Sequence, residues 1–211
     1  MLDSTAMQRT LAVVLLLLLA AIGVVLLVDG SAGGAAGATS SGEFLGPTLP
    51  AGLRAADFTL SDQNGTSVSL HSYRGQVVVL TFIHSRCHDA CPLMVNDIKG
   101  ALNLLPGEGR GVPAIGVSVA PSEDTRASRH RFLREWGMDQ RLRFLSGSGT
   151  QLGPVWHAYA IQPLRGSGID DHSAFVLLID RRGYERVGFA AAELRPEDLA
   201  HDIRALQAER A

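Results

Sequence analysis

Cys87 and Cys91 are the only cysteines in this chain of 211 residues, and they lie in the segment CHDACP with three residues between them. A thiolate is both a nucleophile and a soft metal ligand, so such a pair can exchange with disulfides or hold an ion such as Cu(I) or zinc. A plain structural disulfide is the third interpretation. It would close a very short loop and contribute only about 2 kcal/mol.

Three histidines are candidate partners for these sulfurs. His84 and His88 form a local H-x-x-C-H-x-x-C array with the cysteines, which in principle wraps zinc. His84 ends a predicted strand and His88 lies between the cysteines, so convergence of all four side chains would need a longer loop. His172, in DDHSAF, is the candidate third ligand of a Cu(I) site. Spacing alone does not distinguish a ligand at this position from an ordinary surface or core histidine.

The elements around the cysteines are predicted clearly. Residues 76–84, QVVVLTFIH, form an apolar, β-branched run typical of a strand buried on both faces. Pro92 suits the first turn of a helix that runs to about Leu105. The cysteines therefore lie at the carboxyl end of a strand and the start of a helix, where the helix dipole favours a thiolate.

The rest of the domain is predicted to complete a thioredoxin-like α/β fold. Alternation around Asn64-Gly65 indicates a hairpin. Further strands are expected at 112–119, 142–146, 174–180 and 184–190, and helices at Ser122 (as N-cap) to Trp136, at 150–160 and from Pro196 onward. A βαβ unit followed by a ββα unit predicts a three-layer α/β/α sandwich with an N-terminal β-hairpin. The strand at 174–180 should neighbour the strand that leads to the cysteines.

The N-terminal part predicts a membrane anchor. Residues 11–28 are an unbroken apolar run of 18, nearly the ~20 residues that a bilayer requires. A cleaved signal peptide is the alternative, since SAGGAAGA follows Asp29. We expect residues 1–10 to be a short cytoplasmic segment, 29–50 a flexible Gly/Ala/Ser linker, and 51–211 the folded domain.

Charge indicates orientation and excludes one class of partner. Arg9 precedes the apolar run, and the next basic residue after it is Arg54, so the folded domain should lie on the extracytoplasmic side of the cell membrane. The chain has 19 Lys and Arg against 21 Asp and Glu, without a basic run interleaved with aromatics. We therefore expect no nucleic-acid partner.

Four motifs together resemble the SCO/SenC family of membrane-anchored, thioredoxin-like copper proteins that assist cytochrome c oxidase assembly. They cover about residues 55–207: F-x-L-x-D-x-x-G from Phe58, C-x-x-x-C-P, SV-x-P-x-x-D-T (118–125), and DHS before an apolar strand ending at Asp180. The resemblance implies copper ligation by Cys87, Cys91 and His172. It departs from the family at His88, where Pro is common, and at Ala120, where Asp is frequent.

What the resemblance implies is a metallochaperone that takes copper, as Cu(I) or Cu(II), to the dinuclear copper centre of oxidase subunit II or to another copper-accepting membrane protein. Two alternatives use the same dithiol. A thiol-disulfide oxidoreductase would attack with Cys87 and resolve with Cys91, and a redox or copper sensor would report to a partner. The sequence does not decide whether the protein is an enzyme, and it does not give the oligomeric state.

Overall fold

The computed structural model describes residues 44–163 and 174–209. Their centre is a five-stranded mixed sheet in the order β5-β4-β3-β6-β7. The bounds of its strands are β3 Val78–Ile83, β4 Ala114–Ser118, β5 Leu142–Leu145, β6 Phe175–Ile179 and β7 Glu185–Ala190. The helices are α2 Ala90–Asn103, α3 Arg126–Glu135, α4 Gly149–Ala158 and α5 Pro196–Ala208.

The strand directions confirm the predicted combination of a parallel half and an antiparallel half. β3 pairs in parallel with β4, and β4 in parallel with β5, whereas β6 runs antiparallel to both β3 and β7. Thr81 lies opposite Val176, so the start of β6 meets the carboxyl end of β3. The β3–β6 neighbourhood expected from sequence is thus confirmed.

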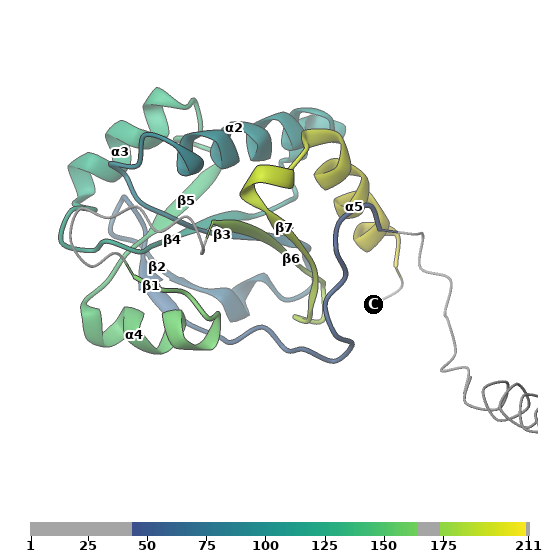
Figure 1. The fold of residues 1–211 in the computed structure, drawn as a ribbon, viewed down its shortest axis with the longest axis horizontal. Coiled ribbons are helices and arrows are strands. Elements are labelled where there is room, and N and C mark those ends of the chain that lie inside the picture. The colour runs from purple at the N-terminus through teal and green to yellow at the C-terminus, as the bar shows by residue number, and fades with distance from the viewer. Residues whose placement is uncertain (1–43, 164–173, 210–211) are drawn as a thin grey trace, which may run out of the picture. The chain divides into compact units, whose positions relative to one another are not determined.

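Both faces of the sheet are covered, which gives three layers (Figure 1). One face packs against α2, α3 and α5 through residues such as Val79 and Ile83. The other packs against α4 and the β1–β2 hairpin through Val78 and Leu80. Every residue of β3 is buried, as its continuous apolar sequence predicts. The fold is the predicted thioredoxin-like α/β/α sandwich.

The predicted hairpin is confirmed, and its turn also covers an edge of the sheet. β1 (Thr59–Ser61) pairs antiparallel with β2 (Ser67–Ser69), and Gly65 takes φ 83° in the turn, a conformation that glycine adopts without a Cβ clash. The buried Asp62 carboxylate accepts hydrogen bonds from the N–H groups of Asn64 and Thr66. The Gln63 amide bonds to the backbone of β5, so this outer strand is not left with unpaired groups there.

The chain around residues 44–54 covers the opposite edge of the sheet. Thr48 bridges Val187 of β7, and the buried Asp202 carboxylate of α5 accepts hydrogen bonds from the N–H groups of Leu45 and Gly46, both at 2.9 Å. Residues 44–50, the end of the predicted flexible linker, are therefore fixed on the domain, because β7 and α5 offer partners for their backbone. The folded domain begins earlier than the predicted residue 51.

A second boundary also differs from its prediction. The helix expected to begin at Ser122 begins at Arg126, with Thr125 as its N-cap accepting from the Ser128 N–H. The acidic residues Glu123 and Asp124 were expected in its first turn. They instead turn toward the cysteine loop, where Glu123 lies beside His84 and Asp124 accepts from the Ser85 N–H. Within 44–163 and 174–209, no helix is long and apolar enough to cross a bilayer; the predicted span, 11–28, lies outside the described residues.

Candidate functional site

The two cysteines lie where the sequence predicts them, between the carboxyl end of β3 and the start of α2. Cys87 is in the connecting loop and is partly exposed, whereas Cys91 is in the first turn of α2 and is 8% exposed. Both are free thiols. The first N–H groups of a helix have no partner within the helix. Here the Cys91 N–H donates to the Cys87 Sγ at 3.4 Å.

This geometry gives the two thiols opposite acidities. The Cys91 side chain donates a hydrogen bond to Cys87 and, with the N–H groups of Cys91 and Asp89 and the nearby His84, lowers the pKa of Cys87 to about 5 against partial burial. The same hydrogen bond, burial and the neighbouring thiolate raise the pKa of Cys91 well above its ordinary value. At neutral pH the site therefore holds a partly exposed thiolate, Cys87, beside a buried thiol, Cys91.

Two acidic side chains from the β4–α3 connection hold the cysteine loop in place. The Asp124 carboxylate, only 2% exposed, accepts from the Ser85 N–H at 2.8 Å and from the Ser118 hydroxyl at 2.5 Å. Glu123 Oε2 lies 2.9 Å from His84 Nε2. The sequence predicts both acids in the first turn of a helix. Their signal was the S-V-x-P-x-x-D-T motif, whose acid is Asp124.

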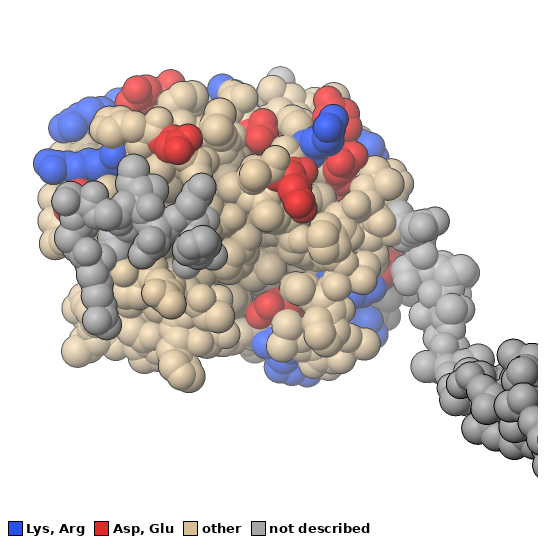
Figure 2. Space-filling model, in the orientation of Figure 1, with Lys and Arg blue, Asp and Glu red and all other residues tan. Residues whose placement is uncertain are grey.

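A groove of about 300 Å³ lies beside Cys87, between the start of α2 and the end of α3. Leu93, 60% exposed, and Trp136 give it an apolar lining. In the described part of the chain, the Ser85 hydroxyl is buried without a hydrogen-bond partner at this place. Figure 2 shows Lys and Arg side chains gathered over α3, which carries the exposed Arg131 and Arg134. The charged side chains that line the groove itself are Asp89 and Glu135, so an incoming molecule would meet an apolar surface and acidic side chains next to the thiolate.

The histidines considered as ligands differ in their surroundings. His84 is paired with Glu123, and His88 is exposed. Among the described side chains, no group of three or more His, Cys, Asp or Glu residues converges so as to hold a metal ion, so the local zinc array is not formed. His172 lies outside the described residues, and its role stays a prediction. Ala120 is buried, and its carbonyl accepts from the Glu123 and Asp124 N–H groups.

A sheet with parallel and antiparallel halves, together with a reduced dithiol at the start of the helix after its central strand, defines a thioredoxin-like dithiol protein. Within this class the chain belongs to the SCO1/SenC family, whose model matches residues 48–208. The match extends slightly beyond the 55–207 that the motifs indicate, and the expected family is confirmed.

Solved structures and a curated relative agree with this assignment. The structure of ScoI from Bradyrhizobium japonicum with copper bound is 29% identical, with a TM-score of 0.63 over 72% of this chain and 99% of that one. Apo Sco1 from Thermus thermophilus is 26% identical, with a TM-score of 0.65 over 78% and 97%. The SCO2-like protein RT0576 of Rickettsia typhi is 26% identical over 133 residues, which are 60% of this chain and 64% of the relative. The chain thus matches less than two thirds of that relative's length.

Proposed function

We propose that this protein is a copper metallochaperone that holds copper through Cys87, Cys91 and His172 and passes it to a copper-accepting protein. The observation that carries the proposal is the pair of sulfurs at the start of α2, one of them already a thiolate. Soft thiolates favour Cu(I) over harder ions. The copper-bound relative from Bradyrhizobium, 29% identical, supports copper as the cargo.

The DHS motif supports the assignment of His172 as the third ligand. This motif lies just before β6 (Phe175–Ile179), and β6 pairs with β3, the strand that leads to the cysteine loop. Low coordination by three ligands leaves the ion open to ligand exchange with the acceptor.

A Cu(I) titration of the reduced protein with a competing chelator tests the proposal. We expect one strong site in the wild type, loss of that site in Cys87→Ser and Cys91→Ser, and a weaker site in His172→Ala. His157→Ala, a change at an exposed histidine on α4, is the matched control and should bind like the wild type. Equal Cu(I) affinity in His172→Ala and the wild type would defeat the three-ligand site.

The unequal acidity of the thiols favours a second function, thiol-disulfide exchange. The Cys87 thiolate would attack an acceptor disulfide, form a mixed disulfide with one acceptor sulfur and release the other. Cys91 would then lose its proton, attack the Cys87 sulfur and displace the acceptor sulfur bound to it. The acceptor gains a dithiol while this chain gains the Cys87–Cys91 disulfide. Reduction of a disulfide peptide that persists in His172→Ala, together with unchanged copper binding, would favour this function over copper delivery.

We further propose oxidase subunit II as the acceptor, with the protein anchored in the cell membrane by residues 11–28 and its folded domain on the extracytoplasmic side. The family assignment and the flanking charges support this placement. Protease accessibility of the domain in intact spheroplasts would test it. A domain protected until the membrane is opened would contradict the orientation.

A further inference from the structure

A cavity of about 380 Å³ lies at the end of the sheet opposite the cysteines. Ala114 and Leu142, the first residues of β4 and β5, line it, whereas the cysteine loop follows Ile83, the last residue of β3. Because these three strands are parallel, their first residues and their last residues lie at opposite ends. The copper and thiol chemistry proposed above makes no use of this cavity.

The lining of the cavity is rich in positive charge. It includes three guanidinium groups, those of Arg110, Arg141 and Arg143, and one carboxylate, that of Asp139. The carboxylate Oδ1 lies 3.3 Å from a nitrogen of His130. Three positive groups against one negative group favour an anion inside the cavity.

The three arginines differ in how far their charge is already satisfied. Arg143 forms an ion pair with the buried Asp62 at 2.8 Å. Arg141 donates to the Asn103 side-chain oxygen at 2.6 Å. Arg110 is exposed, and among the side chains that the structure describes its guanidinium has neither a hydrogen bond nor an ion pair. Arg110 is therefore the cation best able to take up an anionic group.

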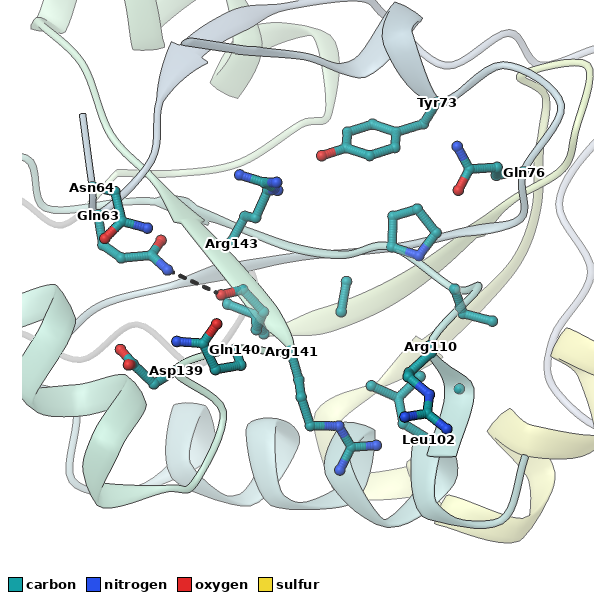
Figure 3. A pocket seen from close by; sticks show the side chains of 15 residues that line it. Gln63, Asn64, Tyr73, Gln76, Leu102, Arg110, Asp139, Gln140, Arg141 and Arg143 are labelled. Atoms are coloured by element: carbon teal, nitrogen blue, oxygen red, sulfur yellow. Dashed lines mark hydrogen bonds between the residues drawn. The ribbon is translucent and has the colours of Figure 1, made fainter. Parts of the chain in front are cut away.

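Apolar side chains complete the lining of the cavity. Its apolar wall is formed by Pro113, which is half-buried, and by the buried Leu102, Val112 and Leu142. Figure 3 shows Arg143 directed toward the ring of Tyr73, with Arg141 and Arg110 on the other side of the cavity. Ligand cavities of about 300–1,000 Å³ that combine apolar walls with a few polar groups fit small organic molecules. The cavity is thus suited to a compact apolar body that carries an anionic group.

We propose that this cavity binds a small organic anion, a phosphate monoester or carboxylate on a compact apolar body. Arg110 binds the anionic group, and the surface around Val112 and Pro113 contacts the body. Guanidinium groups match the planar or tetrahedral oxygens of such anions through paired N–H donors. The proposal does not depend on copper or on the cysteines.

Calorimetric titration of the full chain with phenyl phosphate at low ionic strength tests the proposal. We expect saturable binding that Arg110→Gln weakens by about tenfold or more, because a charge-assisted contact is lost. Arg195→Gln removes the same charge from an exposed position outside the cavity and should bind like the wild type. Backbone amide resonances of residues 109–112, 114 and 140–143 should shift on binding. Equal affinity in Arg110→Gln and the wild type, or no binding at all, would overturn the proposal.

Three further probes define the ligand. Inorganic phosphate should bind more weakly than phenyl phosphate, and equal binding would overturn the role of the apolar surface. Benzoate measures whether a carboxylate replaces the phosphate, and binding of either anion that depends on Arg110 supports the site. Vesicles containing phosphatidic acid carry the same phosphate monoester on a lipid. Binding to these vesicles without binding to phenyl phosphate would overturn a small molecule as the ligand.

Discussion

Removal of the Cys91 side chain should make Cys87 a weaker acid. Cys87 has a pKa of about 5 chiefly because the Cys91 side chain donates a hydrogen bond to its sulfur. A hydrogen bond to a charged group contributes about 1.5–3 kcal/mol, and one pKa unit corresponds to about 1.4 kcal/mol. Cys91→Ala should therefore raise the pKa of Cys87 by about 1–2 units. Partial exposure of Cys87 favours the lower figure.

The rate of alkylation by iodoacetamide, followed against pH on the reduced protein, measures this change. Only the thiolate reacts. Because the pKa of Cys87 lies below the ordinary thiol value of 9.0, the rate should reach its plateau above a midpoint near pH 5 and fall as the pH drops through it. In Cys91→Ala the midpoint moves upward.

Cys91→Ser is the matched control, because its hydroxyl keeps a donor at the same place. Its midpoint should stay nearer to that of the wild type than the midpoint of Cys91→Ala does. A wild-type rate that still rises steeply up to about pH 9 would refute the low pKa. The same midpoint in Cys91→Ala and the wild type would refute the hydrogen bond as its main cause.

Three other predictions follow from the site and the fold. Cu(I) binding near pH 7 should release about one proton, from Cys91, because Cys87 is already a thiolate. Calorimetry in two buffers of different ionisation enthalpy measures the number of protons released, and release of about two protons would contradict an existing thiolate. Asp124→Ala should lower the free energy of unfolding by about 2–3 kcal/mol, because the Ser118 hydroxyl and the Ser85 N–H lose a buried acceptor. Urea unfolding measures this free energy, and an unchanged value would contradict the prediction. Asp202→Ala should cost about 1–3 kcal/mol and increase proteolysis near residues 45–46, and unaltered cleavage would count against the contact.

Local patterns were sufficient for the elements that present the cysteines. The apolar run 76–84 and the stripe after Pro92 predict β3 and α2, because burial on both faces and helical periodicity are visible in the order of residues. The Asn64-Gly65 turn is equally local. These signals place Cys87 and Cys91 at the junction of a strand and a helix without any knowledge of distant contacts.

Long-range partners decided the features that the sequence misassigned. Glu123 and Asp124 match a helix start by type and position, but the loop after β3 offers a histidine and an unpaired N–H that they satisfy instead. Residues 44–50 have the composition of a tether, yet Asp202, more than 150 residues away, fixes their backbone. The motif at 118–125 marks Asp124 but not its partner, and the local sequence of residues 44–50 shows no sign of Asp202.

The sequence by itself determined the family, the position of the dithiol and the layered fold, because motifs and periodic burial depend on neighbours along the chain. Only the tertiary structure decided which thiol is ionised, since that depends on the donors around each sulfur and on burial. The tertiary structure also formed the arginine-lined cavity, because Arg110, which precedes β4, meets Arg141 and Arg143, at the start of β5, only when β4 and β5 pair.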